Sequence, residues 1–137
     1  MSYKVIIPAR LGSTRLPGKP LKEINGKTLI QRVVNQAKKS KAESVCVATD
    51  SKDIIDHCNE NQIDAILTSK NHQTGSDRLA EACNLLNFDE EMLVVNVQGD
   101  EPFIDPVDID NLANLARTKM SNMTTLFSSL HHEDFSD

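Results

Sequence analysis

The sequence predicts a single α/β domain built on a parallel sheet. Apolar runs of four to six residues alternate with segments whose apolar residues recur at helical spacing. Several runs are apolar at consecutive positions, which is typical of strands buried on both faces. Strands that alternate with helices form βαβ units, so right-handed crossovers and one mostly parallel sheet are expected. The length of 137 residues corresponds to about one domain.

Five strands are expected from the apolar runs. The third run is the weakest and is placed near an edge of the sheet, whereas the fourth, MLVVNV, is the most apolar and is placed near the middle. The runs cover residues 3–7, 44–48, 64–67, 92–97 and 124–128.

Four helices fill the intervals between the strands. The first begins with a capping box, in which Thr28 is the cap and Gln31 reaches back to it. Either Asp50 or Ser51 can cap the second, which extends to about residue 61 and carries His57 on its surface without a role.

The third and fourth helices are marked by their apolar faces. The third starts near residue 76, and Asp105 with Pro106 opens the fourth. The apolar face of the third is made of Leu79, Ala82, Cys83 and Leu86, and that of the fourth of Ile109, Leu112, Ala113 and Ala116.

Composition excludes several classes of protein. A net charge of −5 and the absence of Trp argue against a nucleic-acid binder. No apolar run has membrane-spanning length, and the N-terminus does not resemble a signal peptide. The three cysteines form no CxxC pair, so buried thiols and a cytoplasmic location are expected.

A basic, glycine-containing loop follows the first strand. Gly12 and Gly18 let the backbone approach a ligand closely, and Ser13 and Thr14 add hydroxyl donors. The loop is neither a P-loop nor a dinucleotide fingerprint, because proline follows Lys19 and GxGxxG is absent. A site for an anion, most simply a chain of phosphates, is favoured, and a solvated basic turn is the alternative. Between residues 8 and 22 there is no acid, and the cations are Arg10, Arg15, Lys19 and Lys22.

Other polar loops are expected at the same edge of the sheet, because the carboxyl ends of parallel strands lie together. Asp100 and Glu101 follow the most apolar strand, where they could bind Mg²⁺ or simply precede the next helix. Arg78 lies in the first turn of a helix, against the helix dipole, which hints at contact with a base or another ligand. No nucleophile stands beside a base, so catalysis by positioning and charge neutralisation is favoured.

Four motifs in this order resemble the 3-deoxy-manno-octulosonate cytidylyltransferases, the CMP-Kdo synthetases of lipopolysaccharide synthesis: PARLGSTRLPGKPL, ATDS, NHQTGSDRLAEA and NVQGDEPFI. The resemblance covers the chain to about Leu130. It implies a Rossmann-like nucleotide-diphospho-sugar transferase fold with three α/β/α layers and a mostly parallel sheet. It also implies that the anomeric hydroxyl of Kdo attacks the α-phosphorus of CTP, with Mg²⁺ as cofactor.

The resemblance further implies roles for individual residues. Arg10, Lys19 and Asp100 would be catalytic, with Asp100 as the metal ligand. Arg15 and Gln98 would bind Kdo. The residues implied to bind CTP are Pro8, Ala9, Arg10, Ser13, Thr14, Lys19, Gln73, Thr74, Gly75, Ser76 and Arg78.

Members of this family are about twice as long, so residues 1–137 correspond to the nucleotide-binding N-terminal part of the cytidylyltransferase domain, without its C-terminal half. Such a chain is expected to bind CTP weakly and to turn over little by itself, whereas the full-length enzyme would be a homodimer. Two alternatives stay open. One is a sister enzyme that uses amino-Kdo or sialate, and the other is a non-catalytic CTP-binding fragment.

Overall fold

The computed structural model describes residues 3–9, 21–69, 75–88, 92–99, 103–119 and 125–127. The strands of its main sheet are β1 (Tyr3–Ala9), β4 (Ser44–Thr49), β5 (Ala65–Leu67), β6 (Leu93–Asn96) and β7 (Thr125–Phe127). A hairpin adds β2 (Glu23–Ile24) and β3 (Lys27–Thr28). The helices are α1 (Leu29–Lys38), α2 (Lys52–Glu60), α3 (Gly75–Leu85) and α4 (Pro106–Lys119).

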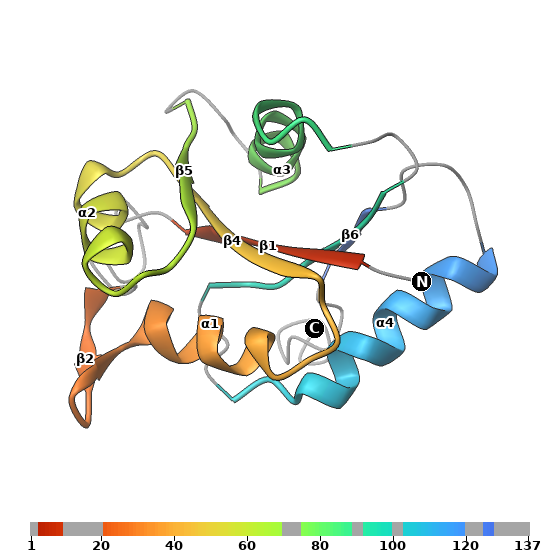
Figure 1. Ribbon diagram of the computed structural model, residues 1–137, viewed down its shortest axis with the longest axis horizontal. Coiled ribbons are helices and arrows are strands. Elements are labelled where there is room, and N and C mark those ends of the chain that lie inside the picture. Colours follow the sequence, from red (N-terminus) through yellow and green to blue (C-terminus); the bar gives the residue numbers. More distant parts are fainter. Residues whose placement is uncertain are drawn as a thin grey trace, which may run out of the picture.

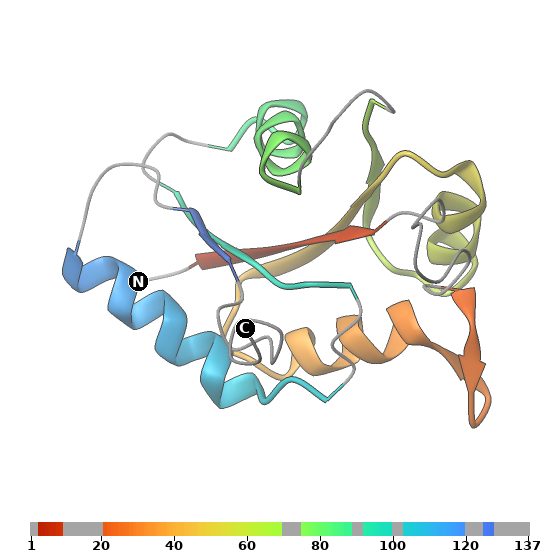
Figure 2. The same cartoon turned by 180° about the vertical axis from the view of Figure 1, so that it is seen from behind.

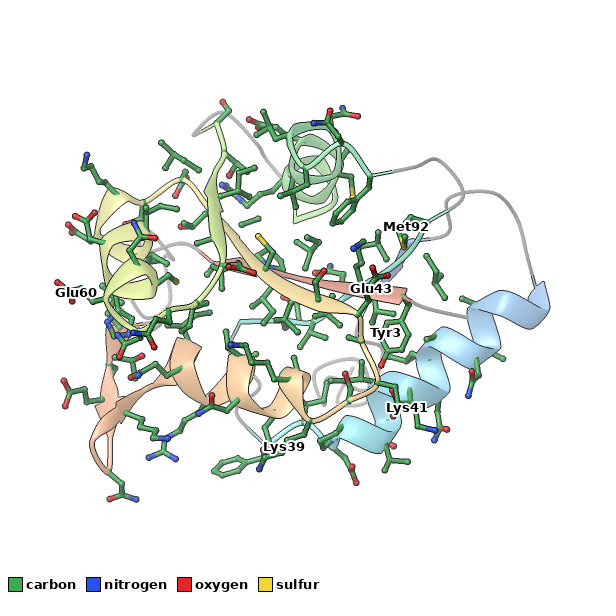
Figure 3. The ribbon with its side chains drawn as sticks, in the orientation of Figure 1. Tyr3, Lys39, Lys41, Glu43, Glu60 and Met92 are labelled. Carbon is green, nitrogen blue, oxygen red and sulfur yellow. The ribbon has the colours of Figure 1, made fainter. Side chains whose placement is uncertain are left out.

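The main sheet has the strand order β5-β4-β1-β6-β7, and all of its pairs are parallel. Tyr3, Glu43 and Met92, which lie at or just before the amino ends of β1, β4 and β6, are therefore close together (Figure 3). The order reverses at β1, since the chain first adds strands on one side of β1 and then on the other. The predicted parallel sheet, the edge position of β5 and the interior position of β6 are confirmed.

Helices cover both faces of the sheet and form three layers (Figures 1 and 2). Of the described helices, only α3 covers one face, where Ala82 and Cys83 pack on Ile6 and Val94. The other face carries α1, α2 and α4, which enclose a larger apolar core. The buried residues of that core on the helices are Ile30, Val33, Val34, Ala37, Ile54, Cys58, Ile109, Leu112, Ala113 and Ala116.

One crossover departs from the expected common hand. The connections through α1 and α2 lead toward β5, with their helices on one face, and the connection through α3 leads back, with its helix on the other face. These three share one hand. The connection through α4 runs in the same direction as that through α3, but α4 lies on the α1 side, so its hand is opposite.

The predicted capping box starts α1. The Thr28 hydroxyl accepts from the Gln31 backbone N–H at 3.3 Å, and the Gln31 side chain accepts from the Thr28 backbone N–H at 2.9 Å. Ser51 caps α2 by accepting the Ile54 N–H at 3.3 Å, which leaves Asp50 for another partner. Both helix starts could therefore be predicted from residues that are close together in the sequence.

His57 joins this network, so its expected lack of a role is wrong. Its Nε2 lies 2.7 Å from the buried hydroxyl of Thr28, and its Nδ1 lies 3.3 Å from the side-chain nitrogen of Asn61. The side-chain Oδ1 of Asn61 accepts from the side-chain Nε2 of Gln31 at 3.0 Å, which closes the ring of contacts. Since an amide nitrogen donates, Nδ1 is the acceptor and Nε2 carries the proton that Thr28 accepts. His57 thereby ties the last turn of α2 to the start of α1.

The β2–β3 hairpin was not predicted from the sequence. Its turn is Asn25-Gly26, with φ of 55° and 88°, as a type I′ turn requires. The Asn-Gly pair is a strong hairpin signal, but strands of two residues have no apolar run that would reveal them. Among the described helices, none is long and apolar enough to cross a membrane.

Candidate functional site

The carboxyl ends of β1 and β6 lie side by side where the strand order reverses. Ligands in open α/β sheets bind in the crevice at this switch point. Pro8 and Ala9 end β1, and Gln98 and Gly99 follow β6. A Cβ atom on Gly99 would lie 2.9 Å from the Pro8 carbonyl oxygen and 3.5 Å from the Ala9 Cβ. The structure thus brings Pro8 and Ala9, which are predicted to bind CTP, against Gly99, which follows the predicted Kdo-binding residue Gln98 in the sequence.

Pro8 suits its position near the end of β1. The ladder between β1 and β6 ends with the pair Ile6–Asn96 and the bond from the Val97 N–H to the Ile6 carbonyl at 3.0 Å. Residues two apart on a strand direct their backbone groups to the same side. The nitrogen of Pro8 therefore points, like the backbone groups of Ile6, toward the side of β6, past the end of the ladder, and away from β4. The missing N–H of proline therefore costs no bond in the sheet.

Arg78 lies in the first turn of α3, as predicted, but its guanidinium group is held by the protein. Its side chain is only 3% exposed, and Nη1 donates to Thr68 Oγ1 at 2.6 Å and to the Ser69 carbonyl at 3.4 Å. Nη2 forms an ion pair with Asp50 Oδ2 at 3.4 Å. The predicted contact of Arg78 with a base stays a prediction, while its contacts with the ends of β4 and β5 are observed.

Three side chains of the ATDS motif make different contacts. The Thr49 hydroxyl, which is fully buried, accepts the Ser51 N–H at 3.1 Å, and Ser51 caps α2. Asp50 stands between them and turns to Arg78. The motif therefore shapes the carboxyl edge of β4. The partners Asp50 and Thr68 were not identified as a pair from the sequence, because nothing local links them to Arg78.

Most of the predicted ligand-binding loop residues lie outside the described residues. Gly75 and Ser76 form the first residues of α3. In the part of the chain that the structure describes, no three His, Cys, Asp or Glu side chains are grouped as a metal ion would need. The predicted residues outside the described ranges are Arg10, Ser13, Thr14, Arg15, Lys19, Gln73, Thr74, Asp100 and Glu101.

The three cysteines are free and buried, as expected. Burial raises the pKa of the Cys46 thiol to about 12 and that of the Cys58 thiol to about 11. Burial also raises the pKa of Cys83. Because the thiolate is the reactive form, these residues are core side chains and not nucleophiles.

Asn96 is a buried polar residue next to the candidate site that sequence reasoning missed. It ends β6 opposite Ile6, has no exposed surface, and neither its Oδ1 nor its Nδ2 has a hydrogen-bond partner in the structure. An amide removed from water without a partner is costly. The NVQGD motif marks the segment, but an orphaned amide is visible only when the neighbours are in place.

Replacing Asn96 with leucine is expected to increase the free energy of unfolding by about 1–2 kcal/mol, because leucine has the same number of side-chain heavy atoms and no polar group to leave unpaired. Urea unfolding of the parent and Asn96→Leu measures this change. A decrease of similar size would show that a polar group does pair with Asn96 in solution.

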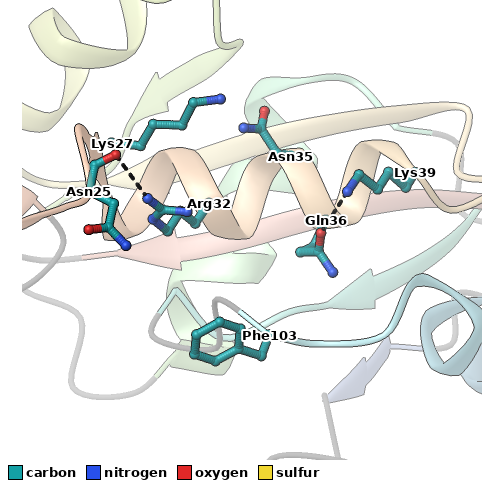
Figure 4. A pocket seen from close by; sticks show the side chains of 7 residues that line it. All are labelled: Asn25, Lys27, Arg32, Asn35, Gln36, Lys39 and Phe103. Atoms are coloured by element: carbon teal, nitrogen blue, oxygen red, sulfur yellow. Dashed lines mark hydrogen bonds between the residues drawn. The ribbon is translucent and has the colours of Figure 1, made fainter.

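A separate groove of about 510 Å³ runs along the outer side of α1 (Figure 4). Lys39 donates to the Gln36 side chain at 3.1 Å, and Arg32 donates to the Asn25 carbonyl at 3.4 Å. The groove is cationic, but α1 lies on the face of the sheet opposite α3, so this groove is separate from Arg78 and its partners. It is lined by Asn25, Lys27, Arg32, Asn35, Gln36, Lys39 and Phe103.

Comparison with known proteins identifies relatives of the whole chain. A family model described as cytidylyltransferase matches residues 4–136. The 3-deoxy-manno-octulosonate cytidylyltransferase of Psychromonas ingrahamii is 49% identical over 139 aligned residues, which cover 100% of this chain and 54% of the relative. That of Polynucleobacter necessarius is 56% identical over 111 residues, which cover 81% of this chain and 44% of the relative.

A solved structure agrees with these matches. It is a CMP:2-keto-3-deoxy-manno-octonic acid synthetase in complex with CTP, with a TM-score of 0.79 and 38% identity. The match covers 86% of this chain and 48% of that one. The chain thus spans about half the length of the proteins it matches, and the predicted resemblance and the predicted Rossmann-like fold are both confirmed.

Proposed function

The chain belongs to the cytidylyltransferase family, and on this premise we propose that it is the nucleotide-binding part of an enzyme that transfers CMP from CTP to 3-deoxy-D-manno-octulosonate (Kdo). The products would be CMP-Kdo and pyrophosphate, for lipopolysaccharide synthesis. The relatives named above and the solved complex with CTP support this reaction. The proposal concerns the whole protein, because the chain spans about half of each relative.

The observation that carries the proposal is the contact between the ends of β1 and β6. Gly99 approaches the Pro8 carbonyl so closely that no side chain fits between them. CTP held at Pro8 and Ala9 would then lie beside Gln98, which is proposed to bind Kdo. The anomeric oxygen of Kdo would bond to the α-phosphorus while the bond to the bridging oxygen breaks. The electron pair leaves with pyrophosphate, and the hydroxyl proton passes to solvent.

The other proposed ligand contacts come from residues that follow β1 in the sequence. Ser13 and Thr14 would donate hydroxyl hydrogen bonds to the triphosphate, beside the cations Arg10 and Lys19. Arg15 would bind the carboxylate of Kdo, since a guanidinium group can grip two oxygens at once. Negative charge on the transferring phosphoryl group would be neutralised by these cations, which is the main contribution a protein makes to such reactions.

Mg²⁺ is proposed as the cofactor. Asp100 directly follows Gly99 in the sequence, and Mg²⁺ sites in proteins use one or two carboxylate ligands. This fits a site completed by phosphate oxygens and water. When bound, the ion would neutralise charge on the phosphates. A cytoplasmic location is proposed from the free, buried thiols, and a homodimer is proposed for the full-length protein.

Calorimetric titration with CTP, with and without Mg²⁺, tests the proposal. We expect weak CTP binding that strengthens with Mg²⁺ and exceeds UTP binding. With Kdo added, pyrophosphate release should be far slower than that of the full-length Psychromonas ingrahamii relative. Failure to bind CTP would reject the proposed function. Tight binding with no transfer when the rest of the protein is present would favour a non-catalytic module, and transfer to amino-Kdo or sialate instead would indicate a sister enzyme.

A further inference from the structure

Two side chains from the first two turns of α3 bind Ser69, which follows the end of β5. Glu81 accepts the Ser69 N–H with both carboxylate oxygens, at 3.0 and 3.3 Å. Arg78, one turn earlier on α3, donates to the Ser69 carbonyl at 3.4 Å. Side chains three residues apart on a helix lie on the same side of it, so Arg78 and Glu81 together bind the backbone C=O and N–H of Ser69. We call Arg78 and Glu81 with their partners the α3 clamp.

Arg78 extends the α3 clamp to a second strand. Its Nη1 also donates to Thr68 Oγ1 at 2.6 Å, and its Nη2 pairs with Asp50 at the end of β4. Thr68 is itself fixed, since its N–H donates to the Thr49 carbonyl at 2.7 Å and its surface is only 5% exposed. The start of α3 is therefore anchored to the carboxyl ends of both β4 and β5.

This arrangement is not expected to stabilise the fold more than apolar residues would. Arg78 is only 3% exposed and stands in the first turn of α3, where the helix dipole opposes a positive charge. A buried ion pair often stabilises a fold no better than apolar residues of similar volume. What a guanidinium group supplies is direction, because its planar fork fixes several acceptors at set angles. The α3 clamp thus fixes the orientation of α3 over the sheet edge.

We propose that Arg78 is a positioning residue, which acts through Thr68 and Asp50 to set the start of α3 at the carboxyl edge of the sheet and thereby the selection of the base. This rests on the proposed function and on the predicted CTP-binding role of Gly75 and Ser76, which form the start of α3. The proposal differs from direct base reading by Arg78, because the guanidinium group is already occupied by acceptors of the protein.

Thr68→Val separates positioning from direct contact. It removes the acceptor of the shortest Arg78 bond, keeps the shape of the side chain and leaves Arg78 in place. The measured quantity is the ratio of the dissociation constants for UTP and CTP, which a loss of folded protein alone would not change. We expect Thr68→Val and Arg78→Lys each to lower this ratio by about tenfold, as for a lost hydrogen bond to a charged group. The double variant should lose little more than either single one.

Glu43→Gln is the control. It removes an ion pair of similar length, Lys4–Glu43 at 3.5 Å, at the amino end of the same sheet, and should leave the ratio unchanged. If Arg78→Lys lowers the ratio while Thr68→Val does not, Arg78 reads the base directly and the positioning role is rejected. An unchanged ratio in both variants also overturns it.

Amide hydrogen exchange decides the case in which the parent binds neither nucleotide, an outcome that rejects the proposed function. The α3 clamp predicts that Thr68→Val accelerates exchange at Ser69 and at the first turn of α3 by about tenfold, whereas Glu43→Gln does not. Unchanged exchange in Thr68→Val would show that the bond from Arg78 to Thr68 fixes nothing.

Discussion

Gly99→Ala is expected to force apart the ends of β1 and β6 and to weaken CTP binding at least about tenfold. The added Cβ would lie 2.9 Å from the Pro8 carbonyl oxygen, a backbone atom that cannot rotate away. Overpacking of this kind costs about 1–3 kcal/mol, and here the cost falls at the switch point. CTP titration in the presence of Mg²⁺, together with urea unfolding, measures both effects.

Gly26→Ala is the matched control for this substitution. Gly26 has a φ of +88°, and a Cβ there would meet nothing within 4 Å. Its replacement is therefore expected to lower stability by about 1–2 kcal/mol, and only because the backbone conformation is strained for a residue with a side chain. Both variants should lose stability, but only Gly99→Ala should lose CTP affinity. If Gly99→Ala binds CTP as the parent does, the contact between the two strand ends does not shape the nucleotide site.

Local sequence was enough to predict the helices and strands of this chain. The capping box of Thr28 and Gln31 and the apolar face of α4 depend on residues within a few positions of each other, so their physics is visible in the sequence. The β2–β3 hairpin is the exception. Its signal is confined to Asn25-Gly26, and it was overlooked because such short strands bury little.

The site was less predictable, because it depends on contacts between distant residues. Strand alternation places loops at one edge but does not say which strands are neighbours, so the approach of Gly99 to Pro8 follows only from the pairing of β1 with β6. The same holds for Arg78, whose ion-pair partner Asp50 is 28 residues away. A cation in the first turn of a helix did indicate a special role. What it could not indicate was that the partners belong to the protein itself.

Arg10→Ala and Lys19→Ala are expected to lower CTP affinity most, each by about 10- to 100-fold, as for hydrogen bonds to a charged group. The proposed function assigns both cations, which follow β1 in the sequence, to the triphosphate. Because the interaction is with phosphate, the loss should be similar for CTP and UTP, and it should shrink at high salt, where charge interactions are screened. This pattern differs from that of Thr68→Val, which changes the ratio between the two bases.

Lys27→Ala is the control for net charge. It removes one cation from the same chain, but Lys27 lies in β3 and lines the groove along α1. If CTP binding needs the basic loop, Lys27→Ala keeps the affinity of the parent while Arg10→Ala and Lys19→Ala lose it. Equal losses of affinity in all three variants would mean that CTP binding depends only on overall charge. A loss confined to Lys27→Ala would indicate that the nucleotide binds in the groove and not at the switch point. The three variants together thus distinguish the switch point from the groove along α1 as the place where the phosphates bind.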